Sequence, residues 1–463
     1  MKKVILSIIF IALVIFVLIK LDKILYVKPV TPNVYKELSS AYNVDIVFIG
    51  TSRIKYSFSP MYIFNKYGIS TYNMGSDGQS YRTAIQLIKK YKPKIAVIDA
   101  TVVIRDINNV LPFMRIDIVN LFTIFDRYSA AKSIFGNEKY LSELNTLKRY
   151  HYRWKELTNI DFIRKSNYYY KGFDPADIFV TAHKLQSPPN FNIEFKQEVL
   201  IIDKIINAAK ESNTKIMFIM LPNVMENRMF MIKFKEYAKD NNVDFIDYNN
   251  EELMNKLNLN YNNIMIDISH MNMYGSYKIM DHLMPFLIQK YTLQDKRNNP
   301  EYKSWHNDYI KYKRAINKAE IIYQSSLDKW LNLSKYDNYT VIMSSNGRNI
   351  INKLSPEIKE YLKEFGLQKY ETKDDNARYV AIIDDGKVYY ETIANALIEY
   401  KGRVNNHFNL LVNSDLNQAV INVSGFPKSK NKNGLNLVIY DKVNREVVDS
   451  IWIDPNQQNV VRR

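Results

Sequence analysis

The sequence predicts an α/β protein: a three-layer unit around a parallel sheet, preceded by a membrane-anchor helix and followed by a β-rich α+β unit. Strand-like and helix-like segments alternate from Asp45 to Tyr291, an apolar run fills residues 4–19, and turn-separated strands dominate about 336–454. We therefore expect four parts: a signal anchor at 1–29, an α/β unit at 40–292, a connector helix at 293–335 and a β-rich unit at 336–463.

The composition narrows the class of protein. With 463 residues, 46% of them hydrophobic, the chain is long enough for two or more cores. It has no cysteine, which excludes disulfides and cysteine-based metal sites. The net charge of +16 favours a polyanionic partner, an envelope polymer or the lipid surface, or else reflects lysine-rich composition alone. We find no helix-turn-helix, zinc-finger or RNP-like pattern, so we expect no nucleic-acid partner.

The N-terminal segment is typical of an uncleaved signal anchor. Two lysines precede the apolar run at 4–19, and residues 24–27 extend it toward the roughly 20 residues that a membrane span needs. No small-residue cleavage site follows, which favours an anchor over a cleaved signal peptide. We expect a single-pass protein of the cell membrane with its large domain outside.

The α/β unit begins with a strand that leads into a serine. Ile46–Ile49 is β-branched and aromatic, Gly50-Thr51-Ser52 forms a turn, and a helix is expected over 60–67. A parallel strand that ends in Gly-x-Ser places the hydroxyl of Ser52 at the carboxyl edge of the sheet, where ligands bind. Its N–H lies near a helix start and can face developing negative charge. Alone, the stretch also fits a plain turn with a capping serine.

A base and a carboxylate occur together in Asp267-Ile-Ser-His270, just ahead of a helical pattern at 273–291. A serine is a weak nucleophile unless a base takes its proton, and the base works better when a carboxylate orients it. One short loop can therefore deliver both groups to Ser52. We expect Ser52 Oγ to lie about 2.6–3.2 Å from the His270 ring.

A glycine-containing block, Asn73-Met-Gly75-Ser-Asp-Gly78, follows a short strand from Thr71 and precedes a helix expected at 79–90. Glycine lets the backbone approach a substrate, so the Gly75 N–H is a candidate oxyanion donor beside that of Ser52. A glycine turn that opens the helix is the alternative.

In this order, the three blocks resemble those of the SGNH/GDSL hydrolase family over about residues 40–290. The resemblance is closest to membrane-anchored members, the DltD-like and alginate-acetylation-like proteins of cell envelopes. It implies a triad of Ser52, His270 and Asp267, with no cofactor and no metal. Arg53 and Asn73, which belong to the matching blocks, are candidates for substrate binding.

One block departs from the family pattern. A Gly-x-Asn block should follow the strand at 94–99, but the chain continues with Ala100-Thr101. Asn223, after the strand at 215–221, is a candidate substitute for the third oxyanion donor.

The interval 105–190 is too long for a simple crossover and is rich in aromatic and basic residues. The run 149–155 contains Trp154, and a second run spans 168–173. Aromatic rings beside cations suit a groove for sugar rings or an anionic polymer, which makes Trp154 a further candidate for substrate binding. Packing of helices on the sheet is the alternative, which we favour for most of these residues.

The C-terminal part has a different pattern. Tyrosines at helical spacing predict an amphipathic connector, and Ser355-Pro356 predicts a helix start. Asp385-Gly386 is a hairpin signal. Through the blocks 382–387 and 433–441, this part resembles the interleukin-like EMT inducer domain of the PANDER proteins. The resemblance implies a compact module that binds, for instance, glycan.

These observations together predict an extracytoplasmic serine esterase or O-acyltransferase. Its substrate would be a cell-wall polysaccharide or a teichoic-acid-type polymer, and a membrane-bound acyltransferase would be its partner in a Gram-positive-type envelope. The alternative is a non-catalytic, glycan-binding scaffold whose site has degenerated, which the missing Gly-x-Asn block favours.

Overall fold

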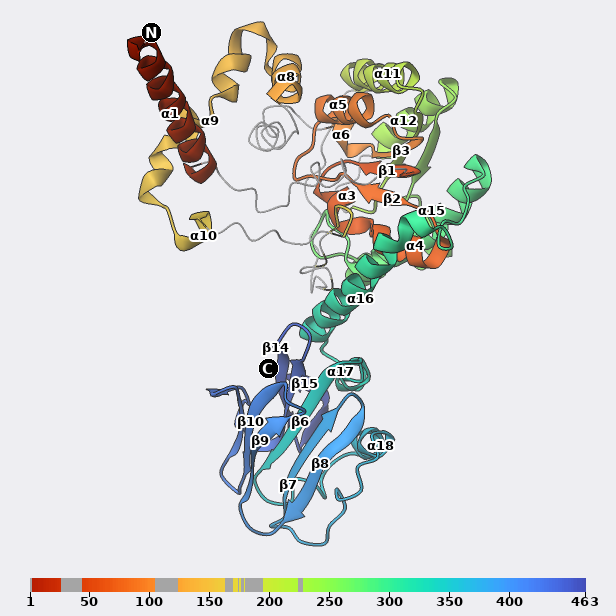
Figure 1. Cartoon of the computed structure of the whole chain (residues 1–463). Coiled ribbons are helices and arrows are strands. Elements are labelled where there is room, and N and C mark those ends of the chain that lie inside the picture. Colours follow the sequence, from red (N-terminus) through yellow and green to blue (C-terminus); the bar gives the residue numbers. More distant parts are fainter. Residues whose placement is uncertain are drawn as a thin grey trace. The chain divides into compact units, whose positions relative to one another are not determined.

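The computed structural model describes residues 2–25, 44–104, 124–162, 170–173, 175, 179, 195–223 and 228–463. The chain separates into two compact units, Met1–Tyr312 and Lys313–Arg463 (Figure 1). The boundary lies inside helix α16 (Lys303–Tyr323), within the stretch expected to connect the units. The predicted fold class is confirmed: a parallel α/β unit follows an N-terminal apolar helix and precedes a β-rich unit.

The first unit is built on a five-stranded parallel sheet with the strand order β2-β1-β3-β4-β5. Val47 of β1 lies between Tyr72 of β2 and Ala96 of β3. The chain therefore adds β2 on one side of β1 and β3 on the other, so the topological switch point lies between β1 and β3. The strands are β1 Ile46–Ile49, β2 Thr71–Asn73, β3 Ile95–Asp99, β4 Lys215–Met220 and β5 Asp244–Asp247.

Helices cover both faces of this sheet (Figure 1). On one face, Leu87, Ile202 and Phe234 of three helices share a buried cluster with alternate sheet residues. On the other face, Phe48 of β1 stacks on Phe58, with ring centroids 4.1 Å apart. The first face carries α5 Tyr81–Tyr91, α11 Phe195–Glu211 and α12 Arg228–Asp240; the second carries α3 Ser52–Ser57, α4 Pro60–Tyr67 and α15 Met273–Tyr291.

The helices α4 and α15 begin and end where the sequence predicts. The Ser59 hydroxyl accepts a hydrogen bond from the Tyr62 N–H, and Gly68, at φ 73°, ends α4 in the left-handed conformation. The Asn272 side chain caps α15 through the Gly275 N–H, at 3.1 Å. The short helix α3 is absent from the prediction and begins at Ser52 itself.

The remaining elements of the first unit are short or peripheral. Gly136, at φ 75°, breaks α8 into two segments. These elements are α6 Thr101–Ile104, α8 Ile124–Leu144, α9 Thr146–Tyr150, η1 His151–Lys155, α10 Asn159–Phe162, α13 Glu251–Lys256, α14 Tyr261–Ile264 and η2 Pro300–Tyr302.

Helix α1 (Lys2–Leu25) is long and apolar enough to cross a membrane. Its window Lys3–Asp22 has 20 residues and a mean hydropathy of 3.2, and none of it is buried in the protein. At about 1.5 Å per residue such a helix reaches roughly 30 Å, the thickness of a bilayer core.

The second unit contains two antiparallel sheets, with strand orders β15-β14-β13-β6-β7-β8 and β12-β11-β10-β9. Its elements are α17 Leu327–Ser334, β6 Tyr339–Asn346, α18 Pro356–Glu364, β7 Arg378–Asp384, β8 Lys387–Ala394, β9 Ile398–Val404, β10 Phe408–Ser414, β11 Ala419–Val423, β12 Phe426–Pro427, β13 Gly434–Asp441, β14 Glu446–Asp454 and β15 Gln457–Arg462.

The second unit has a core on each face of its larger sheet. Ile342 and Val438 face the smaller sheet in one cluster. Val341 and Leu437 instead face Trp330 of α17 in the other cluster. The alternation follows the period of two in a strand.

The hairpin signal Asp385-Gly386 connects β7 to β8, and both residues have positive φ, 51° and 70°. Positive φ at both central residues is the geometry that a two-residue type I′ turn requires. The sequence prediction of a hairpin at this position is therefore confirmed.

Candidate active site

Ser52 stands at the end of β1, on the first turn of α3. Thr51 caps this helix, and its hydroxyl accepts a hydrogen bond from the Arg53 N–H at 3.4 Å. The serine is 9% exposed, so its hydroxyl is close to the surface but supported on most sides. Because α3 follows β1 directly, Ser52 lies at the carboxyl edge of the sheet, beside the switch point.

His270 and Asp267 lie on one tight turn that leads into α15. The turn is closed by a hydrogen bond from the Ile266 N–H to the His270 carbonyl, at 2.8 Å. Inside it, Asp267 Oδ1 accepts from the N–H groups of Ser269 and His270, at 2.8 and 2.9 Å. These local hydrogen bonds hold the Asp267 carboxylate in the orientation in which it contacts the imidazole.

The structure brings Ser52, His270 and Asp267 into one hydrogen-bonded chain. Ser52 Oγ lies 2.7 Å from His270 Nε2, and His270 Nδ1 lies 2.8 Å from Asp267 Oδ2. An ionised carboxylate only accepts, so Nδ1 carries the proton and Nε2 presents its lone pair to the serine hydroxyl. This is the tautomer that a general base requires.

The surroundings keep this carboxylate ionised. Burial alone would raise the pKa of Asp267, but hydrogen bonds from His270 and Ser269 outweigh it and hold the pKa below its usual 3.8. The side chain of Asp267 is 50% exposed and that of His270 is 24% exposed. The triad is therefore more exposed at Asp267 than at His270.

Two residues of α3, Tyr56 and Lys55, lie on the side of the site next to His270. The Tyr56 ring meets the His270 ring edge-on, with centroids 5.5 Å apart. Lys55 Nζ lies 4.8 Å from the centre of the Tyr56 ring and 3.3 Å from the Asp77 carboxylate. The sequence reasoning did not single out these three residues, because nothing in their local pattern places them beside a distant histidine.

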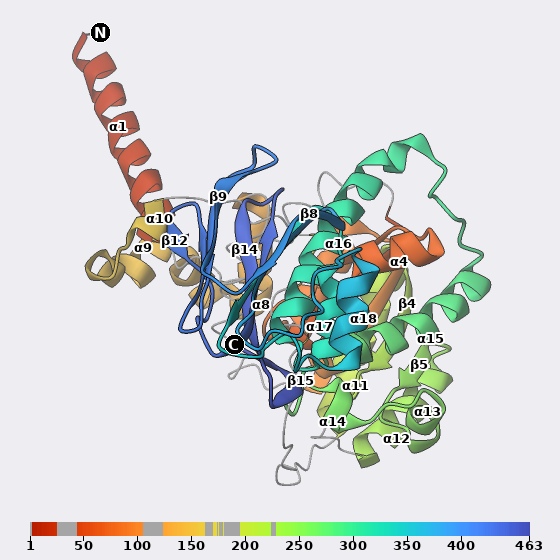
Figure 2. The same ribbon diagram turned by 90° about the horizontal axis from the view of Figure 1, so that it is seen from below.

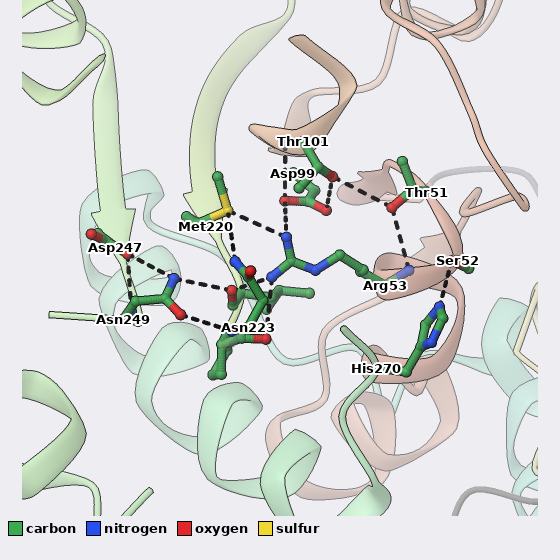
Figure 3. A network of polar contacts seen from close by, with 12 residues as sticks. Thr51, Ser52, Arg53, Asp99, Thr101, Met220, Asn223, Asp247, Asn249 and His270 are labelled. Carbon is green, nitrogen blue, oxygen red and sulfur yellow. Dashed lines mark hydrogen bonds and ion pairs between the residues drawn. The ribbon is translucent and has the colours of Figure 1, made fainter. Parts of the chain in front are cut away.

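Arg53, predicted to bind substrate, instead points into the protein (Figure 3). The residue is 3% exposed. Its guanidinium donates to the Leu221 carbonyl and, at 3.2 Å, to the Pro222 carbonyl. It also lies 4.0 Å from the carboxylate of Asp99. The prediction is therefore wrong: Arg53 ties the start of α3 to the ends of β3 and β4.

The family resemblance would place an asparagine at the end of β3. In this chain the residues there help to hold the start of α3 instead. Thr101 donates from its hydroxyl and its N–H to the two oxygens of Asp99, the second at 3.3 Å. The hydroxyls of Thr51 and Thr101 lie 3.4 Å apart. The carboxyl end of β3 thus holds Arg53 and the cap of α3, and the described residues after it, 100–104, include no asparagine or glutamine.

Asn223 lies beyond the end of β4, on the Arg53 side of the site (Figure 3). Its N–H donates to Asn249 Oδ1 at 2.7 Å, and its Nδ2 lies 4.0 Å from the sulfur of Met220. Asn249, which the sequence reasoning missed, also donates to the Leu221 carbonyl at 3.2 Å. Its role as an oxyanion donor therefore stays a prediction.

Asn73 does not bind substrate, because it is fully buried and occupied. Its Nδ2 donates to the carbonyls of Ile54 and Phe58, at 2.9 and 2.7 Å, where α3 ends. The last carbonyls of a helix have no partner within it, so this amide stabilises the end of α3. The prediction for Asn73 is corrected accordingly.

The Gly75 N–H is already used inside the protein. It donates to Asn73 Oδ1 at 2.8 Å, so in this conformation it is not free to hold an oxyanion. A Cβ on Gly75 would come within 2.3 Å of the backbone nitrogen of Lys55. Glycine is needed here for close backbone approach, as predicted, but the neighbour is α3 and not a substrate.

The structure does not bring Trp154 to the triad. It lies on η1, is 63% exposed, and has Lys155 Nζ at 5.4 Å from its ring. The second aromatic run falls partly outside the described residues. Within its described part, Tyr170 and Phe173 are buried beside Tyr312 of α16, so these two rings pack inside the protein against a helix.

The described part of the chain contains no cluster of three or more His, Cys, Asp or Glu side chains that could hold a metal ion. The chemistry of the arrangement at Ser52 is that of an activated serine hydroxyl with a base and an orienting carboxylate.

Comparisons with known proteins add little to this geometry. No protein-family model matches the chain, and no curated protein matches it. Among solved structures it is similar to an acylhydrolase-type protein of Bacteroides fragilis, at 13% identity and a TM-score of 0.29, over 56% of this chain and 94% of that one. It is also similar to a GDSL-like lipase of Bacteroides thetaiotaomicron, at 13% identity and a TM-score of 0.27, over 56% and 98% of the two chains. Likeness at these TM-scores carries no conclusion about the function of this chain.

Proposed function

We propose that the protein is a membrane-anchored serine esterase or O-acyltransferase that acts outside the membrane on an envelope polymer, a polysaccharide or a teichoic-acid-type chain. The observation that carries the proposal is the unbroken chain of hydrogen bonds from Ser52 through His270 to Asp267, at 2.7 and 2.8 Å. An esterase and a transferase share this site and differ in the acceptor.

In the first half of the reaction, Ser52 Oγ attacks the carbonyl carbon of an ester, and its proton passes to His270 Nε2. Asp267 stabilises the imidazolium that forms. The tetrahedral intermediate then collapses: the bond to the donor alcohol breaks, and the alcohol takes the proton from Nε2. The acyl group remains on Ser52 as an ester.

In the second half, an acceptor hydroxyl attacks the acyl carbon and gives its proton to His270 Nε2. The bond to Ser52 Oγ breaks, and the serine recovers its proton from the imidazolium. Water as the acceptor gives hydrolysis, whereas a sugar or polyol hydroxyl gives transfer.

Negative charge on the carbonyl oxygen needs donors near Ser52. The Ser52 N–H opens α3, where helical N–H groups have no partner within the helix and carry partial positive charge. A second donor from Asn223 would require its amide to turn away from the Met220 sulfur. Loss of one such donor usually lowers kcat by about 10²–10³-fold.

Three features favour transfer onto an anionic polymer at the membrane. The apolar helix α1 would hold the catalytic unit beside its substrate. The net charge of +16 suits an anionic chain. The ordered motifs also resemble those of DltD-like proteins, which makes a membrane-bound acyltransferase the expected partner and a Gram-positive-type envelope the expected setting.

A second candidate function is a non-catalytic scaffold that binds envelope glycan. Its support is specific: β3 ends without an asparagine, and the Gly75 N–H already has an acceptor. The C-terminal unit, which resembles the interleukin-like EMT inducer domain, would then supply the glycan-binding surface.

An acyl-transfer assay separates these functions. The full chain is given an activated acetyl ester, with and without wall-type glycan or teichoic-acid fragments, and products are followed by mass spectrometry. We expect acetyl on Ser52 first and on the polymer next, with slow release to water. Ser52→Ala should abolish both signals, and Ser57→Ala, at the other serine of α3, should change neither.

Each other outcome has a defined meaning. Fast release to water that is indifferent to the polymer would leave an esterase. Glycan binding without any acyl-Ser52 would favour the scaffold. Full activity in Ser52→Ala would remove the serine mechanism.

A further inference from the structure

The short helices that follow α8 pack against the last turn of α1. These helices are α9, η1 and α10, called the collar here (residues 146–162). In both views the collar lies beside the C-terminal end of α1 (Figure 1 and Figure 2). Arg153 Nη1 donates to the carbonyl of Leu25, the last residue of α1, at 3.0 Å. A cation is favoured at this end of a helix, where the carbonyls carry partial negative charge.

Burial along α1 changes abruptly where the collar begins. The large apolar side chains from Val4 to Leu21 are 41–67% exposed, whereas Leu25 is 8% exposed. The protein therefore covers the last turn of α1 and leaves the rest to its surroundings.

The position of the collar along α1 corresponds to the edge of a bilayer. The apolar window ends at Asp22, and Leu25 is three residues beyond it, or about 4.5 Å along the axis. The headgroup region on each side of a bilayer core is roughly 5–7 Å thick. If α1 spans a membrane, the contact between Arg153 and Leu25 lies at headgroup depth.

The outer surface of the collar has the composition of a membrane interface. Tyr152, Trp154 and Phe162 are 50%, 63% and 61% exposed. Lys155 Nζ lies over the Trp154 ring at 5.4 Å, so an aromatic ring and a cation are presented together. Trp and Tyr are enriched at membrane–water interfaces because one end of the side chain is apolar and the other polar.

Arg153 forms two ion pairs inside the collar. Arg153 Nη2 lies 2.9 Å from Asp161 Oδ1, and its Nε lies 4.0 Å from Glu156. Asp161 Oδ2 accepts from the Thr158 N–H at 2.9 Å. Arg153 thereby joins η1, α10 and the end of α1 into one small body.

We propose that the collar is an interfacial membrane-binding element that inserts Tyr152, Trp154 and Phe162 into the headgroup region of the bilayer that α1 spans. It fixes the depth and tilt of α1 at one face of the membrane. The proposal rests on the anchor role proposed for α1, but on neither the catalytic role of Ser52 nor the identity of the polymer.

The test measures the depth of Trp154 in the full chain, reconstituted in vesicles of phosphatidylcholine and phosphatidylglycerol. The chain has 4 tryptophans, so the difference between the emission of the wild type and Trp154→Phe isolates Trp154. We expect strong quenching by lipids that carry a nitroxide near the glycerol and weak quenching by aqueous iodide.

Phe426 offers a matched control in the other unit. It is 65% exposed, and Lys428 Nζ lies 5.8 Å from its ring, as Lys155 lies by Trp154. In Trp154→Phe/Phe426→Trp, the new tryptophan should be quenched by iodide several-fold more than Trp154 and little by the lipid nitroxide. Equal lipid quenching at both positions would overturn the proposal, because the collar would then show no preference of its own.

A second variant tests how the collar is held. Arg153→Gln should detach it from α1, so that lipid quenching of Trp154 falls at least twofold while α1 stays protected from added protease. Trp154 fully open to iodide in the wild type, with α1 protected, would overturn the collar alone. Full chain recovered free of the vesicles would overturn the anchor role and the collar together, whatever the acyl-transfer assay shows.

Discussion

Ser52 and Arg53 are neighbours in the chain, yet they belong to polar networks of opposite kinds. Ser52 joins a half-open chain of bonds with His270 and Asp267, whose side chains are 24% and 50% exposed. Arg53 joins a closed network in which its side chain and that of Asp99 are 4% and 0% exposed. The comparison teaches that one strand end supplies both the reactive group and its rigid support.

The difference predicts different consequences of substitution. In the open network, loss of a group should remove chemistry and leave the fold, because water can replace the lost partner. In the closed network, loss of a group leaves a buried charge or polar atom without its partner, which is costly.

The largest effect is expected for the open network. Ser52→Ala and His270→Ala should each lower kcat by up to about 10⁶-fold, because nucleophile and base act as a unit. The double variant should be no worse than either single one. The measurement is kcat on an activated acetyl ester, with urea unfolding as the check on the fold. If the two losses multiplied in the double variant, Ser52 and His270 would be acting independently, which would contradict the triad.

Asp267→Asn should lower kcat by roughly 10⁴-fold and lower the stability at neutral pH only slightly. The amide can donate to His270 Nδ1, which favours the wrong tautomer. Asp281→Asn is a matched control on α15, since Asp281 is 37% exposed and bonds to Lys66 instead. Equal activity of the two variants would remove Asp267 from the mechanism.

Arg53→Met tests the closed network through stability. It leaves the carboxylate of Asp99 buried without its cation, so we expect a loss of roughly 3–5 kcal/mol in the free energy of unfolding. Asp99→Asn in the same chain should restore part of it, because the uncompensated charge is removed. Urea unfolding measures both, and a loss below about 1 kcal/mol would show that Arg53 is not a structural tie.

Asn73→Ala sharpens the correction made for that residue. The carbonyls of Ile54 and Phe58 would lose their buried donor, so we expect a loss of roughly 1–3 kcal/mol with KM unchanged. Unfolding and initial-rate measurements on the same preparation give both numbers. A rise in KM at unchanged stability would restore a role in substrate binding.

The smallest effect concerns pH. The folded-state pKa of Asp267 lies below its usual 3.8, so its ionised form adds stability above that pH, and this is lost as the pH falls through the folded-state pKa. The stability difference between the wild type and Asp267→Asn should therefore shrink as acid is added below that pH. A difference that grows under acid would contradict the sign of this pKa shift.

Much of the fold could be predicted because it depends on local pattern. Helical patterns in the sequence predicted the spans of α4 and α15, and the Asp385-Gly386 pair predicted its turn. The short helix α3 (Ser52–Ser57) was not predicted, because it is stabilised by contacts with distant segments, such as the Asn73 amide.

The site was predicted in part for the same reason. Ser52, Asp267 and His270 carry their chemistry in their residue types and their order. Arg53 was misjudged because its partners, the Asp99 carboxylate and the carbonyls of Leu221 and Pro222, come from segments far away in the sequence. Gly75 needed glycine as expected, but sequence alone does not say which backbone it approaches.

The turn Tyr170–Phe173 has a consequence for solubility. β2 is an edge strand of the parallel sheet, and its Asn73 N–H donates to the Lys171 carbonyl at 3.0 Å. Gly172, at φ 89°, lies so close that a Cβ would come within 1.9 Å of the Asn73 oxygen. An edge strand with unpaired donors invites a second chain to add a strand, which is how many proteins begin to aggregate. Here the edge donor at Asn73 already has its acceptor in the Lys171 carbonyl.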